Sequence, residues 1–248
     1  MQWLHDNQPD IVGLQEARTC DRKSVVSAFR SEGYRCELRM EPDDKGRNQG
    51  VAILSRHPLE VTQVGLPGQE HRGTRLLTAR TAGLSFTTVC VPGASKKGSI
   101  EQRIERKLAW LDELSKHLRE RNTDDVPAVL CGDFNINPRP IDNYYHWEGR
   151  PEAKSSPGFG ECERSRISSL LKGGWCDLVR ECNPEKRMFS YWHSRNFYNE
   201  DKGLRIDLVF GNAAIVKRLE SAWIDQDHYA EDAKMRKPDH APVVVELA

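Results

Sequence analysis

The chain has 248 residues, with 37 Lys or Arg against 37 Asp or Glu, so its formal net charge at pH 7 is zero. That balance argues against a protein that coats nucleic acid or a membrane through net charge alone, although it allows a local basic groove. No apolar run approaches the roughly 20 residues of a membrane span, and the first residues do not read as a signal peptide. Seven cysteines without a C-x-x-C pair fit reduced thiols better than disulfides or a zinc site. We therefore expect a cytoplasmic protein with no membrane partner.

Hydrophobic periodicity and turn residues predict more strands than helices. Ala82-Gly83 is expected to form a hairpin turn between two of the strands. We find no repeat, linker or low-complexity segment, and so expect one domain over 1–248, with two mainly antiparallel sheets packed face to face and helices outside. The predicted helices cover 1–7, 22–31, 99–121 and 162–171, and the predicted strands cover 11–15, 34–39, 51–55, 75–80, 84–91, 126–130, 189–192, 204–210 and 241–247.

The longest predicted helix, 99–121, carries one apolar stripe at helical spacing. Its other positions are almost wholly charged, and we expect them to face solvent. The stripe consists of Ile100, Ile104, Leu108, Leu111, Leu114 and Leu118.

A polar break follows the apolar strand 126–130. The sequence there is Cys-Gly-Asp-Phe-Asn over 131–135, and the prolines at 138 and 140 cannot continue a strand because they lack an N–H. Asp133 and Asn135 therefore lie where a core strand ends, a place at which a rigid scaffold presents side chains to a ligand. Taken alone, the same pattern is more often a structural Asx turn.

Further acidic groups and a histidine lie at or beside other strand ends, namely Glu16, Asp207, Asp239 and His240. Each of them alone is more often structural. Several carboxylates meeting one histidine would suit a hard cation with oxygen ligands, Mg²⁺ or Mn²⁺, rather than zinc. Such an ion is the usual partner for phosphate-ester chemistry, and a histidine beside a carboxylate can stay charged to stabilise a phosphoryl oxygen.

Five segments in the same order resemble the endonuclease/exonuclease/phosphatase (DNase I-like) superfamily, and within it the exonuclease III branch of abasic-site endonucleases. They are 11–16, 48–53, 131–136 with 141–142, 203–207, and 238–243. The resemblance runs nearly end to end. It implies an α/β (α+β) fold, a four-layer α/β-sandwich of two mainly antiparallel sheets flanked by helices.

The resemblance also implies roles for the polar residues. Asp133 would orient or deprotonate the attacking water, and Asn135 would hold the phosphate or that carboxylate. Asp207 would fix the imidazole of His240, which would stabilise the phosphorane-like transition state. Glu16 would hold the metal, with Asp239 in support. The substrate side would be formed by Asn48, Cys90, Trp192 and Arg195.

Three features depart from the family's pattern. Family members open with a strand whose Asn helps to hold the metal, whereas this chain begins inside the following helix. Either the start of the sequence is truncated, or the protein lacks one inner strand of a sheet. The phosphate-contacting Tyr of the family is Cys90 here, and a thiol is a poor hydrogen-bond donor. Asp201 replaces an Asn and adds a negative charge.

The implied activity is that of a Mg²⁺-dependent DNA-repair phosphodiesterase acting as a monomer on duplex DNA. It would cleave 5′ to abasic sites, remove nucleotides in the 3′→5′ direction and trim blocked 3′ ends. Two alternatives remain open at this point. One is a phosphoesterase of the same fold with an RNA, lipid or inositol phosphate substrate. The other is a catalytically impaired homologue that binds nucleic acid.

Overall fold

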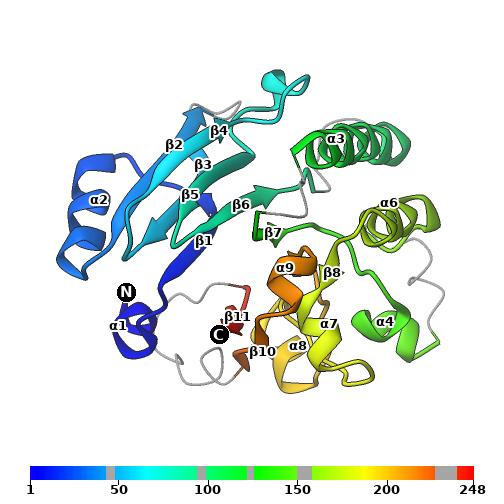
Figure 1. Ribbon diagram of the computed structural model, residues 1–248. Coiled ribbons are helices and arrows are strands. Elements are labelled where there is room, and N and C mark those ends of the chain that lie inside the picture. Colours follow the sequence, from blue (N-terminus) through cyan, green and yellow to red (C-terminus); the bar gives the residue numbers. More distant parts are fainter. Residues whose placement is uncertain (43–47, 94–98, 122–125, 150–157, 227–238) are drawn as a thin grey trace.

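A six-stranded sheet forms the centre of the computed structural model, which describes residues 1–42, 48–93, 99–121, 126–149, 158–226 and 239–248 (Figure 1). Its strand order is β4-β5-β6-β7-β9-β8, and every neighbouring pair is antiparallel except β6 and β7. The strands are β4 (Glu60–Val64), β5 (Leu76–Thr81), β6 (Leu84–Cys90), β7 (Ala128–Asp133), β8 (Cys176–Asp177) and β9 (Asp207–Gly211).

A second β layer packs on one face of this sheet and consists of two separate sheets. One has the order β1-β3-β2, and the other pairs β10 with β11. Strand β1 lies against β6 and β7, and β11 lies against β9. Among the described strands none pairs with the outer edges of β1 and β11. The strands are β1 (Ile11–Ala17), β2 (Arg35–Pro42), β3 (Asn48–Ser55), β10 (Leu219–Ile224) and β11 (Val243–Leu247).

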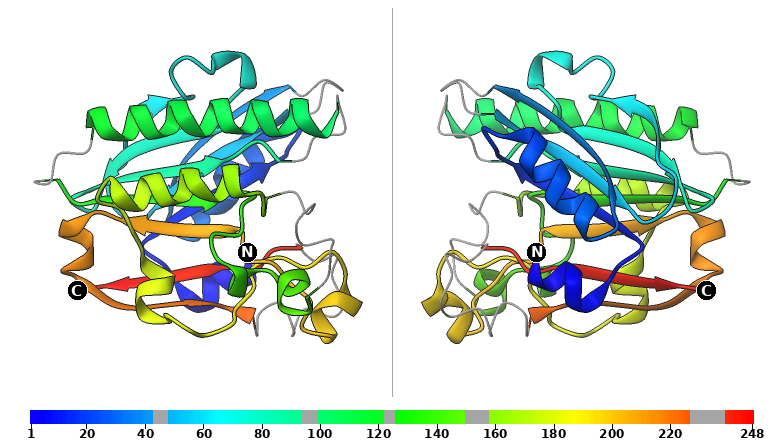
Figure 2. Two further views of the ribbon diagram at one scale, coloured as in Figure 1. Left: turned by 90° about the vertical axis from the view of Figure 1, so that its right-hand side faces the viewer. Right: turned by 90° about the vertical axis from the view of Figure 1, so that its left-hand side faces the viewer.

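Helices cover the outside of both β layers (Figures 1 and 2). Helices α3 (Ile100–Arg121) and α6 (Glu161–Lys172) lie on the outer face of the six-stranded sheet, and α2 (Arg22–Ser31) lies on the three-stranded sheet. This arrangement confirms the predicted α/β fold class. The remaining helical elements are α1 (Gln2–Asn7), η1 (Glu70–Arg72), η2 (Pro140–Asp142), α4 (Tyr144–Trp147), α7 (Leu178–Cys182), α8 (Arg195–Asn199) and α9 (Ala213–Val216). No helix of the described segments is long and apolar enough to cross a membrane.

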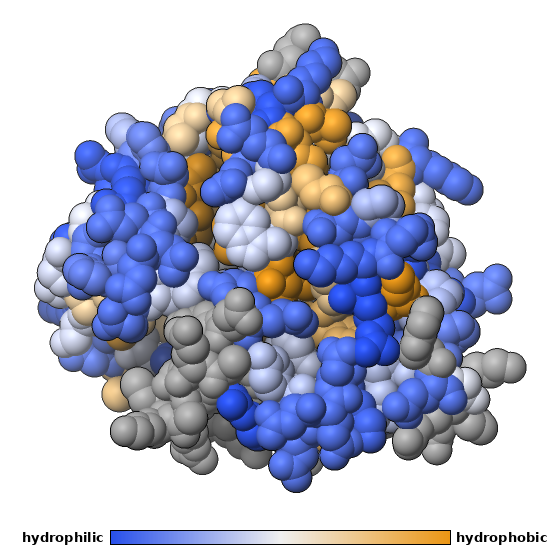
Figure 3. All heavy atoms as spheres, turned by 90° about the horizontal axis from the view of Figure 1, so that it is seen from below, coloured by the Kyte–Doolittle hydropathy of each residue, from blue (hydrophilic) through white to orange (hydrophobic). Residues whose placement is uncertain are grey.

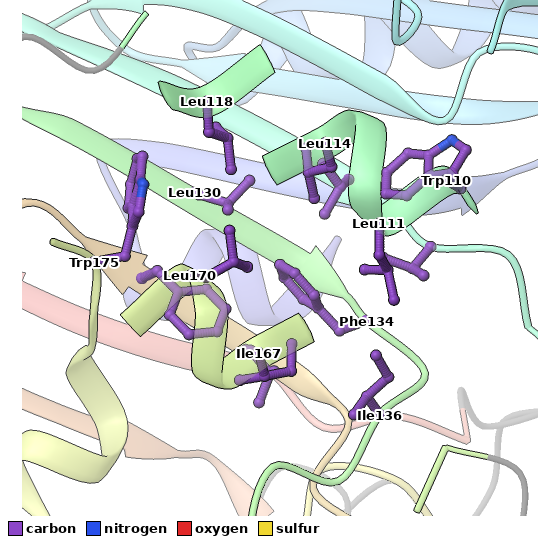
Figure 4. Packing of buried hydrophobic residues seen from close by; sticks show 14 of the residues in the cluster. Trp110, Leu111, Leu114, Leu118, Leu130, Phe134, Ile136, Ile167, Leu170 and Trp175 are labelled. Atoms are coloured by element: carbon purple, nitrogen blue, oxygen red, sulfur yellow. The ribbon is translucent and has the colours of Figure 1, made fainter. Parts of the chain in front are cut away.

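Two hydrophobic clusters sandwich the central sheet because successive side chains of a strand point to opposite faces. On β7, Leu130 belongs to the cluster under α3 and α6, whereas Val129 and Cys131 belong to the cluster between the β layers. Figure 4 shows the first cluster, in which Leu111 and Leu114 of α3 approach the sheet. The polar residues that share the inner face with Val129 are therefore held between the two β layers.

The buried face of α3 differs in part from the predicted stripe. Ile100 is 56% exposed, whereas Trp110 is fully buried. Lys107, expected on the solvated face, is only 3% exposed. The rotation and position of the helix against the sheet determine which of its residues are buried, and the hydrophobicity of the sequence alone does not reveal them.

The segment 189–192 is not a strand, contrary to the prediction. Only Tyr191 forms isolated bridges, one to Leu204 and one to His240. The reason lies in the backbone hydrogen bonds. The N–H groups of Ser190 and Tyr191 both donate to the carbonyl of Leu204, at 2.9 Å each, so no regular ladder forms. Strand β9 likewise begins only at Asp207.

Candidate active site

Three neighbouring strands present a row of polar side chains at one end of the central sheet. Cys90 is the register partner of Asp133, and Asp133 is the register partner of Asp207. The three residues end β6, end β7 and begin β9, respectively. The three residues lie on the face of the sheet that packs against the second β layer, so the carboxylates point toward that layer.

A tight turn after β7 holds Asp133 in a fixed orientation. The backbone N–H of Asn135 donates to Asp133 Oδ1 at 2.8 Å, and Asn135 Nδ2 donates to Asp133 Oδ2 at 2.7 Å. Asn135 Nδ2 also lies 3.2 Å from the carbonyl oxygen of Val91, to which it donates. Asn135 has φ of +52°, a left-handed conformation that Asn tolerates better than most residues. Non-glycine residues in this region often mark functional sites.

Asp207 and His240 form a second pair beside this turn. His240 Nδ1 lies 2.8 Å from Asp207 Oδ2, and Ser190 Oγ donates to the same oxygen at 2.7 Å. Burial of the imidazole opposes its charging. The carboxylates of Asp207, Asp133 and Asp239 outweigh that effect and raise the pKa of His240 to about 10. The imidazole is therefore protonated at neutral pH.

Asp133 has an unusual environment for a carboxylate. It is buried, and this burial together with the charges of Asp207 and Glu16 raises the pKa of Asp133 to about 7. The charge of His240 and the N–H of Asn135 act in the opposite direction but do not cancel the effect. A carboxyl group with a pKa near neutrality can take and release a proton under physiological conditions, as a general base must.

All six polar residues of the predicted constellation line one cleft, whose volume is about 1900 Å³. Glu16 enters it from the end of β1 with φ of +49°, and its carboxylate accepts a hydrogen bond from Arg18 at 2.6 Å. The cleft also runs along β1 and β11. Seen from below, the molecule shows apolar residues between hydrophilic ones (Figure 3). The six residues are Glu16, Asp133, Asn135, Asp207, Asp239 and His240.

The predicted substrate-side residues are placed less uniformly. The side chain of Asn48 lies outside the described part of the structure. Trp192 is only 1% exposed and packs edge-on against Tyr198, away from the cleft. Arg195 is exposed at the start of α8 and does not line the cleft either. Their contacts with a sugar remain predictions.

Cys90 lines the cleft but is buried and held by Arg75. Arg75 Nη1 donates to the carbonyl of Cys90 at 3.2 Å and lies 3.6 Å from its sulfur. Burial and the charge of Asp133 raise the pKa of the Cys90 thiol to about 12. The thiol therefore stays neutral. Asp201, the other departure in this region, forms an ion pair with Arg187.

Sequence reasoning missed a group of arginines that line the cleft. Arg72, Arg75, Arg103 and Arg106 all line it and are half-buried. Burial lowers the pKa of Arg72, and the positive charges of Arg106 and Arg75 lower it further. The net charge of the whole chain is zero and does not reveal this local concentration of positive charge. No single stretch of sequence reveals it either, because the arginines come from two separate segments. Tyr191 and His193 form another missed part of the wall, and the hydroxyl of Tyr191 lies 2.9 Å from His193 Nδ1.

Comparison with known proteins identifies the family. The endonuclease/exonuclease/phosphatase family matches residues 1–229 of this chain. The chain belongs to this family. Exodeoxyribonuclease III of Haemophilus influenzae is 27% identical over 97% of this chain and 90% of its own length.

Solved structures of this family have the same fold. An AP endonuclease from Archaeoglobus fulgidus is 28% identical with a TM-score of 0.85, and the match covers 99% of this chain and 91% of that one. The 3′ phosphatase NExo from Neisseria, bound to a product DNA hairpin, is 28% identical with a TM-score of 0.83 over 100% and 92% of the two chains. As a member of the endonuclease/exonuclease/phosphatase family, the chain is a metal-dependent hydrolase.

The carboxylates of the cleft suit the divalent metal that this family uses. Glu16 and Asp207 both raise the pKa of Asp133, so negative charge is concentrated there, and a cation would offset it. Hard divalent cations prefer such oxygen donors. Within the described segments no three His, Cys, Asp or Glu side chains already form a ligand cluster.

Proposed function

We propose that this protein is a Mg²⁺- or Mn²⁺-dependent DNA-repair phosphodiesterase of the exonuclease III type. Its substrates would be duplex DNA with abasic sites, which it would cut on the 5′ side, and 3′ ends, which it would shorten or trim. The observation that carries the proposal is the pairing of two groups in one cleft. A buried carboxyl group with a pKa of about 7, Asp133, lies beside an imidazolium, His240.

The proposed chemistry divides the work between these two groups. Asp133, oriented by both hydrogen bonds from Asn135, accepts a proton from the water that attacks phosphorus. His240 donates a hydrogen bond to the phosphoryl oxygen on which negative charge grows. Asp207 holds the imidazole at Nδ1, which leaves Nε2 to face the substrate. A preorganised charge of this kind costs little reorganisation during the reaction.

We assign Glu16 and Asp239 to the metal. A bound Mg²⁺ or Mn²⁺ would polarise the phosphoryl oxygen and lower the negative charge of the cleft. Both residues line the cleft beside Asp133 and His240. Glu16, the penultimate residue of β1, has a left-handed conformation, a strained arrangement of the kind that functional sites retain.

The DNA would contact the arginines that line the cleft. Arg72, Arg103 and Arg106 bring positive charge to the same cleft as Asp133, as contacts to a phosphate backbone require. We take 1–248 as one catalytic domain that acts as a monomer. A cytoplasmic location is in keeping with the seven free thiols.

The experiment that tests this function uses a duplex with one tetrahydrofuran lesion. We expect incision 5′ to the lesion with Mg²⁺, no incision with EDTA, and recovery when excess Mg²⁺ is added back. The Asp133→Asn variant serves as the control for contaminating nucleases. If folded protein makes no metal-dependent incision at any concentration, the proposal fails. A panel of RNA, inositol phosphate and 3′-phosphate substrates then shows whether another phosphoester is preferred.

A further inference from the structure

A buried ion pair lies directly behind the turn that carries Asn135. Lys107 of α3 and Glu163 of α6 are 3% and 1% exposed, and Lys107 Nζ lies 2.6 Å from Glu163 Oε1. Neither residue is part of the constellation described above. Burying two charges is costly unless both are fully paired, so a buried pair of this kind calls for a physical reason.

The ammonium of Lys107 has a second partner, which connects it to the site. Lys107 Nζ donates to the backbone carbonyl of Asn135 at 3.0 Å. Asn135 lies outside every described helix and strand, and a charged donor satisfies its carbonyl strongly. Lys107 therefore stabilises the backbone conformation that Asn135 must adopt to donate both of its hydrogen bonds to Asp133.

Glu163 fixes the other side of the same turn. Its Oε2 accepts hydrogen bonds from the backbone N–H groups of Gly158, at 3.1 Å, and Gly160, at 3.2 Å. Gly158 in turn lies so close to Asn135 that an added Cβ would be 2.2 Å from the Asn135 carbonyl oxygen. The carbonyl of Gly158 also accepts from the N–H of Asn137 at 2.8 Å. The turn is thus enclosed by Lys107 on one side and by the segment that Glu163 holds on the other.

We infer that Lys107 and Glu163 are positioning residues that hold the left-handed turn at Asn135, and through it the orientation of the Asp133 carboxylate. The inference rests on the proposed function of Asp133 as general base. It assigns a role in the reaction to α3 and α6, whose apolar side chains pack against the central sheet. It also explains why a lysine occupies the buried face of α3.

The test is the double variant Lys107→Met/Glu163→Gln. It leaves no unpaired buried charge, keeps side chains of similar volume, and keeps an amide oxygen for the N–H groups of Gly158 and Gly160. The ion pair is replaced by two neutral side chains, and the charged donor to the Asn135 carbonyl is lost. We expect kcat on the lesion duplex to fall about ten- to a hundredfold, because small misplacements of a catalytic group cost up to about 10²-fold. KM should stay within about twofold.

Two comparisons separate positioning from general stability. Lys107→Arg keeps the charge and the donors, and should keep kcat within about threefold of the parent. Arg180→Met removes a different buried ion pair, between Arg180 and Asp142, that does not line the cleft. It should lower the melting temperature and leave kcat unchanged. If the double variant does not fold, Lys107→Gln/Glu163→Gln replaces it, because it keeps neutral hydrogen-bonding groups at both positions and still removes the charged donor, and kcat should again fall.

Hydrogen exchange gives a readout that needs no activity. In the double variant the amides of Asn135 and Asn137 should exchange faster. In Arg180→Met the amide of Asn135 should match the parent, whereas Asn137 also contacts the Asp142 network. A parent-like kcat, parent-like exchange at these amides, or an equal kcat loss in Arg180→Met would each overturn the inference. Should the parent itself fail to cut DNA, the proposed function falls, and the exchange of the turn still decides whether the pair holds it.

Discussion

Replacing Asp207 by Asn tests the pairing on which the proposed chemistry depends. The substitution keeps the size of the side chain and an acceptor for Ser190, and removes the negative charge beside His240. In the parent the pKa of His240 is raised from 6.5 to about 10. At about 1.4 kcal/mol for each pH unit, this difference corresponds to roughly 5 kcal/mol as an upper bound.

The net loss of stability should be smaller than this bound. The imidazole is 31% exposed, so solvent screens part of the interaction. Removing Asp207 also relieves its repulsion of Asp133, which lowers the pKa of Asp133 and offsets some of the loss. We expect a loss of about 2 kcal/mol near pH 7, similar to one hydrogen bond to a charged group.

The pH dependence of that loss identifies its cause. A raised histidine pKa stabilises the folded parent fully below pH 6.5, and the contribution disappears as the pH rises through about 10. The difference between parent and variant should therefore shrink from pH 7.5 to pH 10.5, a range in which Asp133 has largely titrated. Urea unfolding followed by tryptophan fluorescence measures it, with the same pair of proteins in a His240→Gln background as the control. A loss of equal size at both pH values would refute the reasoning.

Three other changes test the rest of the site. Asp133→Asn should lower turnover by about 10²-fold or more, the contribution typical of a general base, and should leave the affinity for lesion DNA similar to that of the parent. Turnover equal to that of the parent would show that Asp133 is not the general base. Arg103→Ala and Arg106→Ala should each weaken DNA binding and reduce the slope of log K against log salt by about one, whereas Arg166→Ala, which loses an ion pair with Asp112 outside the cleft, should leave the slope unchanged. The thiol of Cys90, with a pKa of about 12, should resist iodoacetamide at pH 8 in the folded protein and react after unfolding. Mass spectrometry of the modified peptides measures the labelling, and rapid labelling in the folded state would mean that the site opens.

Much of the fold and of the constellation followed from local patterns. An apolar strand that stops at a polar residue identified Glu16 and Asp133, because a strand end is visible in the order of residue types. The pairing of Asp207 with His240 was expected only through the family resemblance. The register that brings Cys90, Asp133 and Asp207 into one row joins segments far apart in the chain.

Other features depend on tertiary contacts that no local pattern records. Lys107 reads as one more charge on a solvated helix face, and only the approach of Glu163 from α6 makes its burial favourable. Trp192 was predicted at the end of a strand and on the substrate side, yet it is buried and packs against Tyr198. The arginines at the cleft have no motif, because Arg72 precedes β5 and Arg103 lies on α3.

The row across β6, β7 and β9 determines which length changes the protein can accept. Deleting or inserting one residue within β7 would reverse the faces of all following positions, so Asp133 would point toward α3 and α6 instead of the cleft. The hairpin turn at Ala82 and Gly83 carries no such constraint, because it lies at the opposite end of β6. Insertions and deletions should therefore be tolerated at that hairpin and selected against within the middle strands.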